Sequence, residues 1–282
     1  MDPLMPLANK NERFIIRGGA SLQGRLRIRG AKNAAVAFMA AALLTEDEVV
    51  IEDVPRIGDV EIMAAVLRSL GATVEWAGEH TLRLKADAIA TFEVPGELVE
   101  LNRASFLVMG PLLGRFGKAV SPPPGGDVIG QRPVDVHLAG FAALGADVQH
   151  VGNVYIAEAE KLRGAPVFMD YPSHTGTENL LMAASLAEGR TIIKNASQEP
   201  EIVALGEMLT QMGATVQGHG TSTIVVEGAK RLRGGRFRLI PDRIEAGTFA
   251  IAAVLTEGEV ALENVCCAHM ESLLWKLERT GA

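Results

Sequence analysis

Three basic residues stand where the sequence predicts a helix to begin. Lys32, with Asn33 beside it, precedes a long apolar run in "RGAKNAA"; Arg103 lies at a similar position in "LNRASF"; Arg132 follows a Pro- and Gly-rich loop. The start of a helix has a positive dipole end and free amides, so it favours an anion. Most Lys and Arg side chains are solvated. Three cations at such positions nevertheless predict a site for a small ligand with two or three negative charges.

The loop before Arg132 has an unusual composition. In "SPPPGGDVIGQRP", 121–133, prolines fix the approach, and Gly125 and Gly126 leave the middle mobile. An acid, Asp127, lies at its tip. The simplest interpretation is a surface turn in which Asp127 caps the following segment.

Signatures of several other chemistries are absent from the sequence. It has no "GxxxxGK[ST]", "GxSxG", HExxH or CxxC motif, and its six histidines are scattered. We therefore expect neither a metal nor a cofactor. The net charge of −7, with acids and bases well mixed, argues against nucleic acid or an anionic membrane as the main partner.

Composition favours a cytoplasmic protein with one large or two ordinary domains in 282 residues. Cys266 and Cys267 are adjacent, so they give no disulfide framework and fit a reducing compartment. The start, "MDPLMPLANKNERF", lacks the basic and apolar regions of a secretion signal. The longest apolar run, 34–44, is far shorter than the roughly 20 residues of a membrane span.

One phrase recurs along the chain. "LGATVEW", "LGADVQH", "MGATVQG" and a final "TGA" place glycines at 71, 145, 213 and 281, about 70 residues apart. An alanine-rich helix and a β-branched strand come before an amphipathic helix, which the glycine closes as its C-cap; a hairpin follows. We expect compact α/β units whose first helix, apolar on every face, is buried. The fourth copy ends where its hairpin should begin, so we expect a longer protein or one completed by another chain.

The chain resembles the enolpyruvyl transferase family, and within it the members that act on UDP-N-acetylglucosamine. The matching phrases run in order from about Arg17 to Val265: "GAKNAA", "RASFLVMGPLLGRFG", "GGDVIGQRPVDVHLAG", "LAEGRTIIKNASQEPEIV" and "PDRIEAGTF". The resemblance implies an α/β fold, an inside-out α/β barrel of repeated βαβαββ units with helices wrapped inside sheets. Domain one would be 32–240, with three units. Domain two would be 1–31 plus 241–282, with one unfinished unit.

The resemblance implies transfer of the enolpyruvyl group from phosphoenolpyruvate to the 3′-hydroxyl of UDP-N-acetylglucosamine, with release of phosphate. This is the first committed step of peptidoglycan synthesis, and therefore bears on cell shape and division. Lys32 resembles the catalytic lysine that neutralises phosphoenolpyruvate, Asn33 a sugar contact, and Arg103 and Arg132 the arginines of the phosphate and sugar-nucleotide pocket. Two stretches resemble nucleotide-binding segments: Arg132, Pro133, Val134, Asp135 and Val136, and Tyr171, Pro172, Ser173 and His174.

The resemblance also gives Asp127 a second interpretation. Most family members have at this position a cysteine that donates a proton and is alkylated by fosfomycin, whereas some have aspartate and resist the drug. An aspartate can do the same acid chemistry if a closed, water-poor loop raises its pKa. We therefore expect Asp127 to be the catalytic acid of a fosfomycin-insensitive enzyme.

The sequence departs from the family at two places. His174 and Thr175 replace a small or apolar pair, which bears on the uracil contacts. The family's hydroxyl-activating aspartate and a second set of arginines would lie beyond residue 282, so we expect residues 1–282 alone to be poorly active or inactive, with the missing units of domain two as a partner. Asp242 and Glu245 are interpreted as structural or interdomain residues.

Two rival functions stay open at this stage. 5-Enolpyruvylshikimate-3-phosphate synthase has the same fold and chemistry, but requires basic motifs other than "GGDVIGQRPVD". A non-catalytic sugar-nucleotide-binding paralogue or fragment would keep the pocket and lack the second half, although retention of Lys32, Asp127 and Arg132 argues against it.

Overall fold

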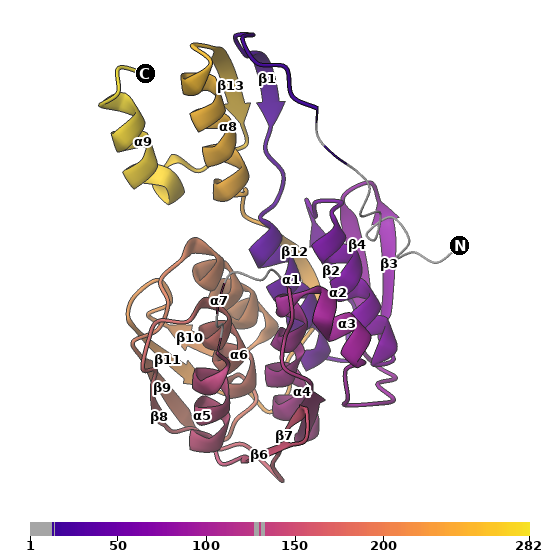
Figure 1. The fold of residues 1–282 in the computed structure, drawn as a ribbon. Helices are drawn as coiled ribbons and strands as arrows, with labels where there is room; N and C mark the ends of the chain where they lie inside the picture. The colour runs from indigo at the N-terminus through magenta and orange to yellow at the C-terminus, as the bar shows by residue number, and fades with distance from the viewer. Residues whose placement is uncertain (1–12, 14, 127–129, 131–132) are drawn as a thin grey trace.

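The computed structural model describes residues 13, 15–126, 130 and 133–282. They form a larger and a smaller body joined by two chain segments (Figure 1). The core of the larger body consists of buried residues between Ala31 and Leu239. The core of the smaller body consists of Ile28, Ala246 and Met270. The domain boundaries 32–240 and 1–31 plus 241–282 stay a prediction. The two cores show which side chains pack together.

The third repeat shows the complete unit. Its elements are β8 (Pro166–Phe168), α6 (His174–Ala184), β9 (Arg190–Lys194), α7 (Pro200–Met212), β10 (Thr215–Gln217) and β11 (Thr223–Glu227). The sheet order is β10-β11-β9-β8, with β8 parallel to β9 and β11 antiparallel to it. This succession is the βαβαββ unit that the family resemblance implies.

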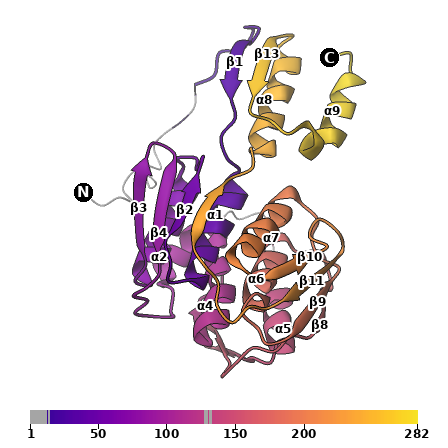
Figure 2. The same cartoon turned by 180° about the vertical axis from the view of Figure 1, so that it is seen from behind.

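The first repeat has the same sheet order but takes one strand from far along the chain. Its own elements are α1 (Lys32–Ala41), a 3-10 helix (Ala42–Leu44), β2 (Val49–Glu52), α2 (Gly58–Ser69), β3 (Thr73–Gly78) and β4 (Thr81–Lys85). The order is β12-β2-β4-β3, where β12 (Gly235–Arg238) pairs in parallel with β2. Figure 2 shows β12, in orange, beside the first repeat. The segment that leaves the third repeat thus closes the larger body.

The second repeat lies between the other two in the chain. It contains α3 (Gly96–Leu101), a 3-10 helix (Arg103–Val108), α4 (Met109–Phe116), β5 (Lys118–Ser121), α5 (Asp135–Ala143), β6 (Asp147–Val151) and β7 (Val154–Glu158). Its sheet order is β5-β7-β6, and a single parallel bridge, Glu93 to Val120, stands where the other repeats have a leading strand.

The buried helices and the glycine caps follow the sequence pattern. Residues 34–41 of α1 are all buried, because this helix is apolar on every face. Residues 176–184 of α6 are also buried, and the polar ones near its start are enclosed with partners such as His137 and His174. The glycines after α2, α5 and α7, at 71, 145 and 213, have φ values of 105°, 94° and 119°. Both predictions are confirmed, since this left-handed backbone favours glycine.

The last repeat departs from the expected burial. The smaller body contains β1 (Gln23–Arg27), α8 (Arg243–Leu255), β13 (Glu259–Glu263), a 3-10 helix (Cys267–Met270) and α9 (Glu271–Glu278). Only Ala246 and Gly247 of α8 are buried, and Leu255 is 78% exposed, so the prediction of a buried first helix is wrong here. The helix is exposed because the sheet beside it is small. Among the described residues, β13 pairs only with β1, whereas β2 and β9 have neighbouring strands on both sides.

Two antiparallel segments, residues 28–32 and 239–243, connect the bodies. Ala31 N donates to Ile240 O at 2.8 Å, and Asp242 N donates to Arg29 O at 2.9 Å. The Asp242 carboxylate then joins two helices. Its Oδ2 accepts from Lys32 N, at the start of α1, at 2.9 Å, and its Oδ1 accepts from Ile244 N, in α8, at 2.8 Å.

Other carboxylates support the same connection. Oδ1 of Asp242 also accepts from Glu245 N at 3.0 Å, and Glu245 Oε2 accepts from Arg29 N at 3.3 Å. Both acids thus have the structural role between the bodies that the sequence suggests. Asp53 is 8% exposed, and its Oδ2 lies 3.3 Å from Nη2 of Arg238, the residue just before the second connecting segment.

Asp242→Ala should loosen both helix starts at once. It leaves the three amides without an acceptor, and loss of one N-cap costs about 0.5–2 kcal/mol. Amide hydrogen exchange at Lys32 and Ile244 should therefore accelerate about tenfold. Asp242→Asn keeps one oxygen acceptor and should have a smaller effect, and Asp170→Ala, at an exposed side chain, is the control. Unchanged exchange at both amides in Asp242→Ala would contradict the bridging role.

Candidate functional site

A cavity of about 390 Å³ lies where α1, α6 and the 3-10 helix 103–108 begin. Its volume is within the range of small-molecule sites. Five residues predicted from the sequence line it together: Lys32, Asn33, Arg103, Ser173 and His174. The three chain regions are far apart in sequence, so only the packing of the repeats brings these groups to one place.

Lys32 is held by an acid that the sequence analysis missed. Its Nζ lies 3.3 Å from Oδ2 of Asp59, whose Oδ1 accepts from Asn102 Nδ2 at 2.6 Å. Lys32 is 44% and Asp59 36% exposed at the side chain, so the ion pair is weak and the ammonium can turn to an incoming anion. The available signal for Asp59 was its place in the first turn of α2.

The prediction of free amides at the start of α1 needs a correction. The Lys32 amide donates to Asp242, as described above, and is therefore not open to a ligand. The N-cap position, Ala31, provides no side-chain acceptor, which explains why an acid from the distant connection serves instead. At this helix the cation that faces the cavity is the Lys32 side chain rather than the first amide.

Arg103 opens a 3-10 helix, in agreement with the helix start predicted there. Asn102 caps this helix, because its Oδ1 accepts from Ala104 N at 2.8 Å. Arg103 Nη2 donates to the Pro133 carbonyl at 2.9 Å. The Asn102 side chain, 8% exposed, thus links the Ala104 amide next to Arg103 with the Asp59 carboxylate. It too was missed, although Asn before a predicted helix is an N-cap signal.

The two predicted nucleotide-binding stretches lie against each other. Tyr171 Oη donates to Asp135 Oδ1 at 2.8 Å and also lies 3.4 Å from the Pro133 carbonyl. Burial and the hydrogen bond to Asp135 raise the pKa of Tyr171 to about 12, so the phenol stays a donor. Val134 and Val136 are buried at 6% and 4% exposure, and their side chains belong to the core. The remaining member, Pro172, is exposed.

His174 and Glu178 form a buried pair on α6. His174 Nε2 lies 3.4 Å from Glu178 Oε1, and the Glu178 side chain is 2% exposed. Burial, with Glu201 and Glu199 nearby, raises the pKa of Glu178 well above its ordinary value, and burial lowers the pKa of His174. Both shifts favour the uncharged form of the group concerned. Glu178, a third residue missed from the sequence, lines the cavity.

A second buried network begins at Thr175 in the cavity wall. Gly110 N donates to Asn179 Oδ1 at 2.7 Å, which directs the Asn179 Nδ2 donor to His137 Nδ1 at 2.9 Å. His137 therefore carries its proton on Nε2, which lies 3.3 Å from Thr175 Oγ1. Burial, assisted by Arg103, lowers the pKa of His137 to about 3.

Two predicted residues, Asp127 and Arg132, lie outside the described residues. The residues on either side reach the site: Gly126 lines the cavity, and the Pro133 carbonyl binds Arg103. Within 13, 15–126, 130 and 133–282, no group of three or more His, Cys, Asp or Glu is arranged to hold a metal. No helix in these ranges is long and apolar enough to cross a membrane.

Comparison with known proteins decides the family. The family model of EPSP synthase (3-phosphoshikimate 1-carboxyvinyltransferase) matches residues 16–282. The chain belongs to this family. Its fold is also that of solved relatives: the enolpyruvyl transferase NikO from Streptomyces tendae gives a TM-score of 0.75 at 24% identity, covering 86% of this chain and 57% of that one. EPSP synthase from Acinetobacter baumannii gives 0.74 at 21% identity, covering 95% and 61%. The predicted α/β fold is confirmed.

Two curated relatives are similar to this chain over nearly its whole length. UDP-N-acetylglucosamine 1-carboxyvinyltransferase 2 of Carboxydothermus hydrogenoformans is 50% identical over 272 residues, and UDP-N-acetylglucosamine 1-carboxyvinyltransferase 1 of Caldanaerobacter subterraneus subsp. tengcongensis is 47% identical over 270. These alignments cover 96% and 95% of this chain, but 64% of each relative. The chain thus spans under two thirds of the length of these relatives.

The buried His137 predicts a defined loss of stability in acid. Its pKa is about 3 in the folded protein, against 6.5 ordinarily, so only the unfolded chain binds this proton as the pH falls below about 6.5. The free energy of unfolding should fall between pH 6.5 and 3, with His137 contributing at most about 1.4 kcal/mol per pH unit. Imidazole ¹⁵N shifts should show neutral His137 in the native protein at pH 5 and protonated His137 in urea. A native midpoint above pH 5 would contradict the assignment.

Proposed function

We propose that this protein transfers the enolpyruvyl group of phosphoenolpyruvate to the 3′-hydroxyl of UDP-N-acetylglucosamine and releases phosphate. The observation that carries the proposal is the convergence of Lys32, Asn33, Arg103 and the start of α6 on one cavity. Phosphoenolpyruvate and a diphosphate bring several negative charges, which cationic side chains that converge on one site stabilise. The names of the relatives given above support the choice of sugar nucleotide.

The cavity suggests a role for each residue. We assign the phosphate of phosphoenolpyruvate to Lys32, whose exposed ion pair with Asp59 is easily exchanged for a stronger one. We assign the sugar to Asn33 and the sugar-nucleotide phosphates to Arg103 and, from the sequence, to Arg132. The exposed edge formed by Asp135 and Tyr171 is a candidate nucleotide contact, with His174 beside it.

The proposed reaction has an addition and an elimination step. The 3′-oxygen attacks C2 of phosphoenolpyruvate while C3 takes a proton, which we assign to Asp127, and the hydroxyl proton passes to a base. In the second step C3 returns a proton, the C2–O bond to phosphate breaks, and the enol ether forms. We place the base outside residues 1–282, where the family resemblance puts the hydroxyl-activating aspartate.

This reaction would place the protein in peptidoglycan synthesis in the cytoplasm, upstream of cell-wall growth, cell shape and division. Residues 1–31 and 241–282 would then be part of a second domain, completed by units beyond these residues. The apolar face of α8 and the unpaired edge of β13 among the described residues fit such a completion.

Phosphate release tests the proposed function. Residues 1–282, and the same chain extended by the C-terminal third of the Carboxydothermus relative, are assayed with phosphoenolpyruvate plus either UDP-N-acetylglucosamine or shikimate 3-phosphate. We expect release from the extended chain with the sugar nucleotide only, and little or none from residues 1–282. Release with shikimate 3-phosphate would overturn the proposal. Sugar-nucleotide binding without release by the extended chain would favour a non-catalytic binding protein.

Lys32→Ala should slow the extended enzyme. Removal of a charge-assisted contact to the reacting phosphate costs roughly 2–4 kcal/mol in transition-state stabilisation, so kcat/KM should fall about 30-fold or more. Lys118→Ala, which removes an exposed ion pair between Lys118 of β5 and Glu158 of β7, should leave the rate unchanged. Equal rates for Lys32→Ala and Lys118→Ala would mean that the anion binds elsewhere.

Asp127 should make the extended enzyme insensitive to fosfomycin. A carboxylate is a poorer nucleophile toward the epoxide than a thiolate, so no covalent adduct should form. Asp127→Cys should retain an acid at this position and become inactivated by the drug. Mass spectrometry after incubation gives the adduct directly, and labelling of the unchanged protein at Asp127 would refute this assignment.

A further inference from the structure

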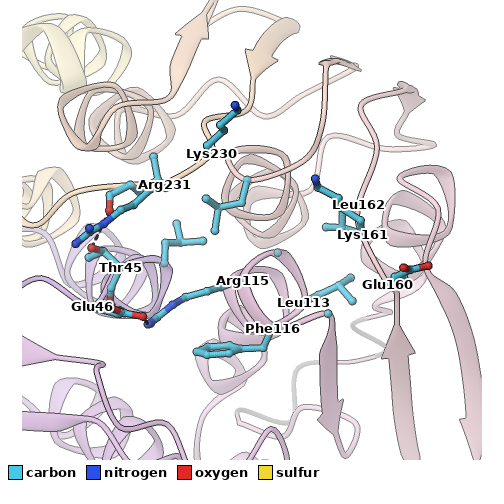
Figure 3. A pocket seen from close by; sticks show the side chains of 15 residues that line it. Thr45, Glu46, Leu113, Arg115, Phe116, Glu160, Lys161, Leu162, Lys230 and Arg231 are labelled. Atoms are coloured by element: carbon cyan, nitrogen blue, oxygen red, sulfur yellow. Dashed lines mark hydrogen bonds and ion pairs between the residues drawn. The ribbon is translucent and has the colours of Figure 1, made fainter.

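A second cavity lies at the opposite ends of the buried helices. Its volume is about 530 Å³, and it shares no lining residue with the site at the start of α1 and α6. It is bounded by the segments that follow α1 and α6 and by the end of α4, one from each repeat of the larger body. Figure 3 shows it with three cations, Lys161, Lys230 and Arg231, around an apolar centre.

The floor of this cavity is made of leucines from all three repeats. Four of them are at most 3% exposed and the fifth is half-buried: Leu44, Leu113, Leu162 and Leu232, and Leu186. Phe116 adds an aromatic ring beside them. Because the four buried leucines are already packed, the half-buried Leu186 and Phe116 provide the apolar surface that a ligand can contact without displacing a protein hydrogen bond.

Two loops with nearly the same sequence bring the cations to the rim. "KLRG", 161–164, and "RLRG", 231–234, each bury their leucine in the floor. Equivalent backbone bonds hold both loops: Arg163 N donates to Leu144 O at 2.9 Å, and Arg233 N donates to Met212 O at 2.8 Å. The first residue of each tetrapeptide lines the cavity, whereas the arginine after the leucine does not.

Basic side chains outnumber acidic ones in the lining of the cavity. Four cations and two carboxylates, Glu46 and Glu160, line it, while Glu188 and Asp47 pair with two of the cations from outside the lining. One cation, Arg115, is used internally: it is 13% exposed, and its Nη1 donates to the carbonyls of Leu43 and Thr45 at 2.9 and 3.0 Å. Arg115 thus donates hydrogen bonds to carbonyl groups that follow α1 and stabilises the cavity wall.

The other three cations are available to a ligand. Lys230 has no hydrogen bond or ion pair within the part of the chain that the structure describes. Lys161 pairs with Glu188, and Arg231 pairs with Asp47 at 2.7 Å, but both pairs are exposed. Exposed pairs contribute about 0–1 kcal/mol, so a dianion between the loops competes successfully with them.

We propose that this cavity binds a small organic phosphate with an apolar body. The phosphate would lie between Lys230 and Arg231 on one loop and Lys161 on the other, and the apolar part would rest on the leucine floor. An inorganic anion leaves that floor empty, and a neutral apolar molecule leaves the cations unused, so both should bind more weakly.

The test uses 1-naphthyl phosphate, with 1-naphthol and inorganic phosphate as its two halves, titrated calorimetrically into residues 1–282. We expect 1-naphthyl phosphate to bind at least tenfold more tightly than either half. Lys230→Glu/Arg231→Glu should weaken it at least tenfold. Arg163→Glu/Arg233→Glu makes the same change of charge at one exposed residue of each loop, outside the cavity, and should retain binding.

Further variants separate this cavity from the first site and from misfolding. Lys32→Ala should bind 1-naphthyl phosphate as the unchanged protein does. Lys230→Glu alone, which breaks no described contact, should weaken binding severalfold with an unchanged melting temperature. Loss of binding in Lys32→Ala, no effect of Lys230→Glu/Arg231→Glu, equal binding of inorganic phosphate or of 1-naphthol, or no binding at all would each overturn the proposal.

Discussion

The Asp242 carboxylate joins the starts of two helices, one from each body, at the edge of the candidate site. It accepts hydrogen bonds from the first amide of α1 and from two amides of α8, so one side chain caps two helices of different bodies. Charged acceptors at helix starts are favoured by the unpaired amides and by the helix dipole. Since Lys32 is the first residue of α1, the cap also fixes the backbone from which the cavity lysine extends.

Asp53 has the complementary role on the other side of the connection. This residue, at φ 65°, accepts from Gly30 N through its carbonyl at 3.0 Å. Its carboxylate faces Arg29, in the first connecting segment, and Arg238, the last residue of β12. A nearly buried carboxylate among several cations is tolerated because each partner compensates part of its lost hydration. Asp53 and Asp242 therefore stabilise the connection between the two bodies, where neighbouring arginines would otherwise repel one another.

The three repeats have opposite chemistry at their two ends. At the helix starts, polar and charged side chains from different repeats converge on the proposed substrate cavity. At the other ends, leucines and the two similar tetrapeptide loops form the second cavity. Both sites arise because each buried helix runs through the larger body from one face to the other, so repetition of one unit gathers equivalent ends.

The sequence by itself determined the repeat, the buried α1 and α6, the glycine caps and the cations at Lys32 and Arg103, because periodicity, φ preference and helix-start chemistry act over a few residues. The tertiary structure decided which groups meet. Asp59 and Asn102 are 43 positions apart, and Asp242 lies 210 positions from Lys32, so no local pattern specifies either contact. Burial of Val134 and exposure of α8 were decided in the same way, because they depend on which distant strands and helices cover each surface.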